Sequence, residues 1–158
     1  MQTINTIDIQ EVVTAHLLQL LDTMFSIKAV PLGKSVPEAE PERVSGSVGF
    51  GGEAVAGVVY IHLSARFAAL LAAGMLGTDP QSLSEAEVND VVGELANILS
   101  GGLKSWLCDA SFSCAASTPV VIRGSSFAIE SSPGVERLCL EFSSGVNRFW
   151  VEVHFKFQ

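Results

Sequence analysis

Charged residues are scarce in this sequence, and basic ones most of all. Only 16% of the 158 residues are charged, and 9 Lys+Arg stand against 17 Asp+Glu, which gives a net charge of −8. So few cations leave no basic stripe for a nucleic acid or an anionic membrane, and we expect neither partner. With 48% hydrophobic residues the chain has enough apolar material for a folded core. The low charge content also points to a further buried surface, such as a subunit interface.

Cysteine is rare as well, and long apolar runs are missing. The three cysteines form no CxxC pair and cannot all pair with one another, which argues against a secreted disulfide scaffold. The most apolar stretches, residues 12–21 and 67–76, span about ten residues, whereas crossing a bilayer takes roughly 20. Met1 to Asn5 carry no basic cluster and lead into no cleavable apolar segment. We therefore expect one cytoplasmic domain over residues 1–158.

Apolar residues at helical spacing predict three helices. The first covers residues 6–25 and the second residues 65–76. The third opens at Ser84, which forms a capping box with Glu87, and runs to about Leu107.

Short runs rich in β-branched and aromatic residues, separated by Gly, Ser and Pro turns, predict strands. Residues 31–46 instead hold three prolines among three glutamates and are expected to form a polar loop. Helices together with hairpin-linked strands favour an α+β domain with a largely antiparallel sheet. The expected strands are residues 44–50, 54–63, 111–117, 120–123, 125–131, 137–142 and 149–157.

The third predicted helix carries a polar stripe opposite its apolar face. Such a stripe is usually only the solvated side of a helix. Here, however, three glycines lie inside the helix, where each costs roughly 0.5–1 kcal/mol relative to alanine. Asn97 is also a poor helix former at a position where Lys or Glu would suit better. Local costs of this kind indicate a functional surface. The stripe consists of Glu87, Asp90, Glu94, Asn97, Gly101 and Lys104, in steps of three and four residues.

The spacing Asp90-x-x-x-Glu94-x-x-Asn97, followed after 21 residues by Pro119, resembles the signature of the chemotaxis phosphatases CheC, CheX and FliY. In order and spacing, residues 44–124 resemble the CheX branch. The resemblance implies a CheC-like fold. It also implies an activity, hydrolysis of the aspartyl phosphate of a phosphorylated CheY-type response regulator.

The resemblance also implies residue roles. Asn97 would position the attacking water, and Glu94 would pair with the active-site lysine of the regulator. Asp90 and Pro119 would be supporting motif positions. No cofactor is expected in this chain, because Mg²⁺ would come with the partner regulator.

Two further expectations concern partners. If the first helix is aligned on the same motif, Ala15 and Leu18 fall where Glu94 and Asn97 sit, so we expect one site per chain. CheX-like members form homodimers through joined sheet edges, and we expect the same here.

Gly101 and Lys104 are candidate contacts for the regulator, although Lys104 is equally well explained as a solvated charge near a helix C-terminus.

The isolated histidines and two alternative functions remain to be considered. His16, His62 and His154 are isolated in the sequence, so packing explains them better than metal ligation. One alternative function is a non-catalytic module that binds a response regulator or a flagellar-switch component. A second alternative is a structural subunit whose polar helix face is merely solvated.

Overall fold

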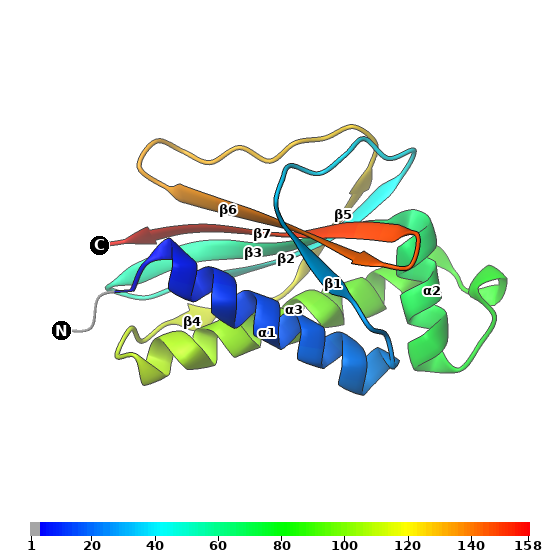
Figure 1. Ribbon diagram of the computed structural model, residues 1–158, viewed down its shortest axis with the longest axis horizontal. Coiled ribbons are helices and arrows are strands. Elements are labelled where there is room, and N and C mark those ends of the chain that lie inside the picture. Colours follow the sequence, from blue (N-terminus) through cyan, green and yellow to red (C-terminus); the bar gives the residue numbers. More distant parts are fainter. Residues whose placement is uncertain (1–3) are drawn as a thin grey trace.

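Three helices lie against one face of a seven-stranded sheet in the computed structural model, which describes residues 4–158 (Figure 1). Every strand pairing is antiparallel, so the expected α+β class is confirmed. Met1 to Thr3, part of the segment expected to lack a targeting signal, lie outside the described residues. The elements are α1 (Thr6–Phe25), β1 (Val30–Lys34), β2 (Arg43–Gly51), β3 (Val55–Ser64), α2 (Ala65–Leu76), a 3-10 turn (Pro80–Ser82), α3 (Glu85–Asp109), β4 (Ala115–Ala116), β5 (Val120–Gly124), β6 (Glu136–Ser144) and β7 (Asn147–Phe157).

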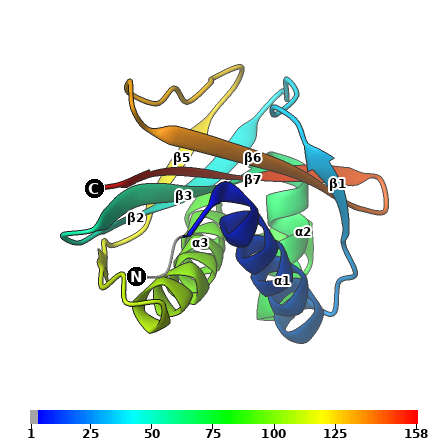
Figure 2. The same ribbon diagram turned by 60° about the vertical axis from the view of Figure 1, so that its left-hand side comes forward.

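The strand order places the two ends of the sheet far apart in the sequence. The order is β1-β6-β7-β3-β2, and both β4 and β5 pair with the outer edge of β2. One edge of the sheet is therefore β1, and the other is made by β4 and β5. Figures 1 and 2 show α1 and α3 side by side beneath the sheet, with α2 at one end.

The two faces of the sheet differ in chemistry because side chains alternate along each strand. The helix-facing positions of β7 are apolar and fully buried, whereas the opposite face carries Trp150, Glu152 and His154. Two loops, residues 35–42 and 125–135, cross above this second face (Figure 1). The helix-facing positions of β7 are Phe149, Val151, Val153 and Phe155.

Close contact between α3 and β2 fixes the orientation of the long helix. A Cβ on Gly46 would lie 2.8 Å from the Val92 carbonyl oxygen and 2.9 Å from the Ala96 Cβ, so only glycine allows this approach. The apolar side of α3 is buried against the sheet, and the predicted polar stripe therefore points outward. The buried positions include Val88, Val91, Val92, Leu95, Leu99, Leu103 and Leu107.

The predicted helices are confirmed. α1 and α2 have the expected bounds, and α3 ends two residues later than expected, at Asp109. The Ser84 hydroxyl accepts a hydrogen bond from the Glu87 backbone N–H, and the Glu87 carboxylate accepts one from the Ser84 N–H, as the capping box requires.

The prediction of a loop over residues 31–46 is wrong at both ends. Residues 30–34 form the edge strand β1, and β2 begins at Arg43. Pro31 is tolerated because an edge strand needs hydrogen bonds on one side only. The pairing with β6 shifts register between Pro31 and Gly33, and Gly33 adopts φ +95° at this irregularity.

Two expected strands do not form as predicted. Of residues 111–117 only Ala115–Ala116 form a strand, because the Phe112 N–H bonds to the Leu107 carbonyl and continues the end of α3. Residues 125–131 form no strand. β5 already occupies the edge of β2 next to them, and the Phe127 carbonyl accepts a hydrogen bond from Arg43 instead of a neighbouring strand.

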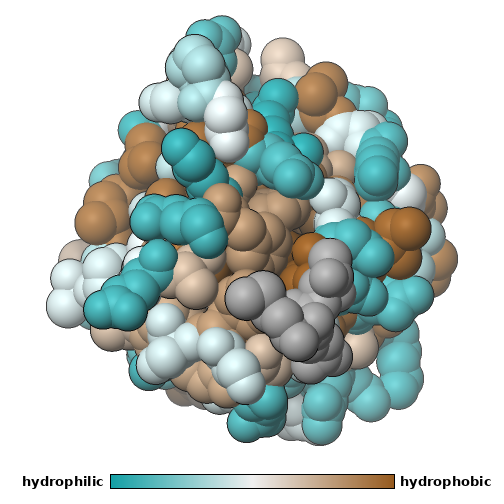
Figure 3. Space-filling view, turned by 90° about the vertical axis from the view of Figure 1, so that its left-hand side faces the viewer, coloured by the Kyte–Doolittle hydropathy of each residue, from teal (hydrophilic) through white to brown (hydrophobic). Residues whose placement is uncertain are grey.

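The end of the molecule near the C-terminus shows hydrophobic side chains framed by hydrophilic ones (Figure 3). Aromatic rings close this end of the core, with Phe155 buried and Phe112 and Phe157 half-buried. Phe112 and Phe157 meet edge to face with centroids 5.2 Å apart, and Phe155 lies 5.8 Å from Phe157. Over residues 4–158, no helix has the length and apolar character needed to cross a bilayer.

Candidate functional site

The polar stripe of α3 is open to solvent at its centre. Asp90, Glu94 and Asn97 are exposed, whereas Gly101 and Lys104 are half-buried. Glu94 and Asn97 lie one turn apart, about 4.5 Å along the helix axis. Within residues 4–158 neither side chain makes a hydrogen bond or an ion pair. The arrangement therefore presents a carboxylate and a carboxamide outward, side by side and unengaged.

Pro119 comes from a different part of the chain and lies against the same helix. A Cβ on Gly93 would lie 3.7 Å from the Pro119 Cβ and 3.6 Å from a Val121 methyl group, which is ordinary packing distance. The structure thus brings Pro119 next to the turn that carries Glu94. Pro119 is itself exposed, so it forms a rim beside the stripe.

An arginine contact that was not predicted from the sequence joins β5 to the start of α3. Arg123 donates to the Asn89 Oδ1 at 2.8 Å and to the Glu42 Oε1 at 3.0 Å, and its Nε lies 3.3 Å from the Glu85 Oε1. These contacts hold the strand after Pro119 against the first turns of the helix. No local signal marks them, because 34 residues separate Arg123 from Asn89.

The glycines of α3 have different environments. A Cβ on Gly102 would lie 2.6 Å from the His16 Nδ1, so this glycine lets α1 approach closely. Gly101 has no such neighbour within 4 Å, which leaves open space on the stripe one turn beyond Asn97. A cleft of about 180 Å³ runs between α1 and α3. The cleft is lined by His16, Gln19, Leu20, Thr23, Met24, Ile98 and Leu99.

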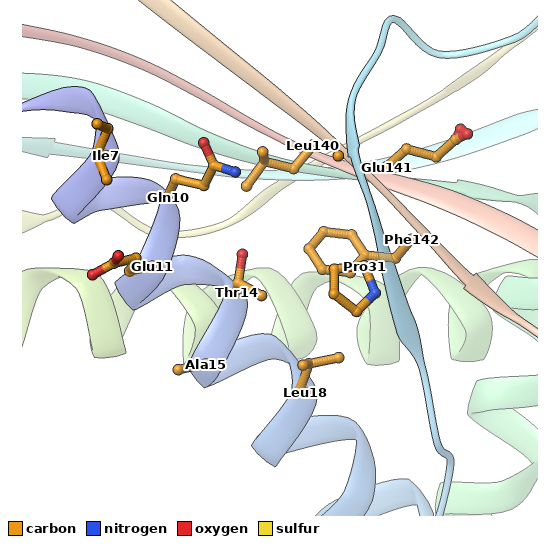
Figure 4. Close-up of a pocket in the computed structure, with 11 residues that line it drawn as sticks. Ile7, Gln10, Glu11, Thr14, Ala15, Leu18, Pro31, Leu140, Glu141 and Phe142 are labelled. Atoms are coloured by element: carbon orange, nitrogen blue, oxygen red, sulfur yellow. The ribbon is translucent and has the colours of Figure 1, made fainter.

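A larger groove, about 540 Å³, lies between α1 and β1. In Figure 4, Thr14 and Leu18 point toward Pro31 and Phe142, whereas the Glu11 carboxylate points away from them. Ala15 and Leu18 both line the groove. With alanine and leucine at the aligned positions, α1 does not repeat the Glu–Asn pair.

A buried polar cluster lies on the other face of the sheet. Glu152 is 1% exposed, and its carboxylate accepts hydrogen bonds from His62 at 2.9 Å, His154 at 2.6 Å and Arg137 at 2.6 Å. Burial acts to raise the pKa of Glu152, but these hydrogen bonds outweigh it and lower the pKa to about 2. The Ser45 hydroxyl bonds to the second nitrogen of His62 at 2.6 Å.

Two histidines are therefore partners of a buried carboxylate, and His16 packs on Gly102. In the part of the chain that the structure describes, no three His, Cys, Asp or Glu side chains are grouped so as to hold a metal ion. The cluster is not among the predictions from the sequence, although the alternation of polar residues along β7 signals it.

The exposed side chains of Glu94 and Asn97 on α3 can each make a defined interaction with a partner or a water molecule. A carboxamide both accepts and donates hydrogen bonds and can orient a water molecule. A carboxylate one turn away can pair with a cation on an approaching surface. Because both groups point into solvent, the group that reacts has to arrive on a partner.

The comparisons with known proteins bear directly on this helix. The family model for the chemotaxis phosphatase CheX matches residues 44–143, well over half of the chain, including the stripe and Pro119. The chain belongs to the CheX family. The comparison with curated proteins gives no significant match.

CheX and CheC-like structures share the fold over nearly the whole chain. CheX from Vibrio vulnificus is 30% identical with a TM-score of 0.80, over 92% of this chain and 95% of that one. A CheC-like superfamily protein from Shewanella sp. PV-4 is 28% identical with a TM-score of 0.82, over 97% and 99% of the two chains.

A third structure is a complex of CheX with CheY, BeF3 and Mg²⁺ from Borrelia burgdorferi. Its similar chain is 23% identical with a TM-score of 0.73, over 93% of this chain and 97% of that one. At this identity the likeness shows the fold alone.

Proposed function

We propose that this CheX-family protein hydrolyses the aspartyl phosphate of a CheY-type response regulator. The observation that carries the proposal is the exposed and unengaged pair of Glu94 and Asn97 on α3, within the region that matches the chemotaxis phosphatase family. The second alternative, a subunit in which this face is buried, is not favoured, because both side chains are exposed within the chain.

The proposed mechanism divides the work between the two proteins. The regulator contributes Mg²⁺ and a lysine, which neutralise the charge on the phosphoryl group. Asn97 holds a water in line with the phosphorus, and Glu94 pairs with the regulator's lysine and so fixes the position of the helix. Water then forms a bond to phosphorus, the bond to the aspartate oxygen breaks, and aspartate and inorganic phosphate are released.

The remaining motif positions support this pair. Pro119 and Gly93 pack α3 against β5, so Pro119 helps to hold the turn that carries Glu94. Asp90 extends the exposed stripe one turn toward the helix start. The open space at Gly101 lets the regulator's surface approach closely, and Lys104 adds a cation for an acidic patch on that surface.

Two features support a CheY-type partner in a reducing compartment. The solved complex from Borrelia burgdorferi pairs a chain of this fold with CheY and Mg²⁺. The cysteines Cys108, Cys114 and Cys139 are all unpaired, as is usual in the cytoplasm. We therefore place the reaction in the cytoplasm.

We also propose a homodimer joined at the β1 edge of the sheet. β1 pairs only with β6 among the described strands, and its side chains are exposed, including Val30 at 57% and Leu32 at 51%. The opposite edge, β5, lies beside Pro119 and the catalytic stripe. Pairing at β1 leaves that side free for the regulator.

The test is phosphate release from a phosphorylated CheY-type regulator of the same organism. Wild type is compared with Asn97→Ala, Glu94→Gln and the control Asp109→Asn, which removes one exposed carboxylate at the end of α3. Binding of each variant to the beryllofluoride-activated regulator is measured in parallel, and circular dichroism checks the fold. We expect wild type and control to accelerate release and the other two variants not to.

The binding data separate catalysis from docking. Asn97→Ala that still binds but no longer accelerates release supports water positioning. Loss of binding and of release together in both variants assigns the stripe to docking only. Binding by wild type without any acceleration contradicts the phosphatase and leaves a response-regulator binding module.

A further inference from the structure

A hollow of the protein lies on the sheet face opposite the helices, away from the stripe of α3. It has a volume of about 280 Å³ and lies beneath the two loops that cross this face. Its floor is charged and its walls are largely apolar. It is lined by Val36, Pro37, Arg43, Phe127, Ala128, Ile129, Arg137 and Glu152.

Arg43 brings a buried positive charge to this cavity. The residue is 4% exposed, and it donates to the Phe127 carbonyl at 2.9 Å and the Glu38 carbonyl at 3.1 Å. Its guanidinium also lies 4.7 Å from the centroid of the Phe127 ring. All of these partners are uncharged, and no ion pair within residues 4–158 includes Arg43. Two carboxylates, Glu40 and Glu152, add favourable charge from nearby without contacting Arg43.

The carboxylate of Glu152 attracts Arg43 from a distance but does not contact it, because other donors occupy its oxygens. One oxygen accepts from Arg137 and His154, and the other accepts from His62. Arg137 uses its Nε for this bond, so its two terminal nitrogens are left for another acceptor. The cavity therefore holds two guanidinium groups and one carboxylate that is fully hydrogen-bonded.

A neighbouring hollow extends the same basic region. It shares Val36 and Arg137 with the cavity and adds Lys34. Three cations, Arg43, Arg137 and Lys34, and one carboxylate, Glu152, thus line the two hollows of a protein that carries only 9 Lys+Arg and a net charge of −8. Burying a guanidinium against neutral carbonyls is costly unless an anion offsets its charge.

We propose that this cavity binds a small organic monocarboxylate with a short apolar body. A carboxylate matches the paired N–H donors of a guanidinium, and the aliphatic and aromatic walls suit a hydrocarbon chain. A dianion such as phosphate fits less well, because Glu152 would repel its second charge and the walls offer it little hydrogen bonding. The site is independent of the phosphatase reaction.

The probes are isovalerate, the neutral isovaleramide and inorganic phosphate, each titrated into the ¹⁵N-labelled full-length chain and followed by NMR. We expect isovalerate to bind saturably with a Kd of about 1 mM or lower. The shifted amides should cluster at Val36, Arg43 and residues 127–129. Isovaleramide and phosphate should bind much more weakly.

Two variants locate the site. Ala128→Phe fills the cavity from an exposed position without changing a charge, and Arg43→Lys removes the forked donors. Each should weaken isovalerate binding by about tenfold or more, whereas Arg66→Gln on α2 should leave it unchanged. If Arg43→Lys fails to fold because it releases the two loops, Ala128→Phe alone decides.

Several outcomes would overturn the proposal. No saturable binding of isovalerate would make Arg43 a purely structural link between the loops. Equal binding of the amide would identify an apolar hollow without anion recognition, and tighter binding of phosphate would identify a different ligand. Undiminished binding by Ala128→Phe would place the ligand elsewhere.

Discussion

At the scale of single residues, adjacent glycines of α3 serve opposite purposes. Gly102 is required by packing, because the His16 ring fills the space where a side chain would stand. Gly101 has no neighbour there, so nothing within the chain explains it. A helix keeps such a costly residue without a packing need when another molecule has to approach, which agrees with the proposed docking face.

This contrast predicts opposite signs for two alanine substitutions. Gly102→Ala should destabilise the fold by about 1–3 kcal/mol, because the new Cβ would lie 2.6 Å from the His16 Nδ1 and the half-buried ring would have to shift. Gly101→Ala should stabilise it by about 0.5–1 kcal/mol through helix propensity alone. Urea denaturation of both variants measures the free energy of unfolding. Destabilisation by Gly101→Ala would contradict the open space assigned to it.

The buried carboxylate of Glu152 predicts a pH dependence of stability. Its pKa is about 2 in the folded protein and near the ordinary 4.5 when the chain unfolds. A lowered carboxyl pKa contributes stability that is fully present above pH 4.5 and is lost as the pH falls toward 2. Glu152→Gln should cost roughly 3 kcal/mol at neutral pH, because Arg137 would lose its buried partner.

The measurement is urea denaturation of wild type and Glu152→Gln between pH 7 and pH 3. The difference between the two proteins should shrink toward acid, since only wild type has this carboxylate to protonate. Glu130→Gln, an exposed control, should follow wild type at every pH. A constant difference would show that Glu152 titrates alike in both states.

At the scale of elements, the helices could be predicted from the sequence and part of the sheet could not. Residues close in the chain fix α2 and α3, through Ser64 and Ser84 as caps and the spacing of apolar residues. β1 forms by pairing with β6, more than a hundred residues away. Because Pro31 is typical of a loop, the sequence pattern did not predict a strand there. Residues 125–131 look like a strand but cross above the sheet as a loop, where the Phe127 carbonyl bonds to Arg43.

Part of the candidate site could likewise be predicted from the sequence, and part could not. Spacing along one helix predicted that Glu94 and Asn97 share a face, and the structure confirms that this face is exposed. The bonds that Arg123 makes to Asn89, and Arg43 to Phe127, join distant segments, so only the folded chain reveals them. The catalytic roles stay predictions until the regulator is assayed.

The capping box of α3 predicts a local energetic effect. Ser84→Ala removes the acceptor for the Glu87 N–H and should cost about 1 kcal/mol of stability. The backbone N–H of Ser84, and after it the Ser84 side chain, lower the pKa of Glu87. Alanine keeps the backbone donor, so in the variant that pKa should rise only part of the way toward its ordinary value. NMR titration of Glu87 measures this shift, and Ser105→Ala on the same helix serves as the control. An unchanged pKa would argue that the box does not persist in solution.

At the scale of the whole molecule, we expect one edge of the sheet to form the dimer and the other to lie next to the bound regulator. The β5 edge lies beside the stripe, and the β1 edge lies at the opposite end of the strand order. A dimer formed at β1 would leave one complete site on each subunit, because Glu94, Asn97 and Pro119 all come from the same chain. Assembly and catalysis are therefore expected to be separable.

Leu32→Lys tests this separation, because an inserted charge on an edge strand opposes pairing with a second copy. We expect the wild type to be a dimer in light scattering at micromolar concentration, and the variant to be a monomer that still dephosphorylates the regulator. Ile122→Lys, the matched change on β5, should remain a dimer. Dissociation by Ile122→Lys alone would move the interface to the catalytic side, where the dimer and the regulator would compete for one edge, and dephosphorylation would then fall as protein concentration rises.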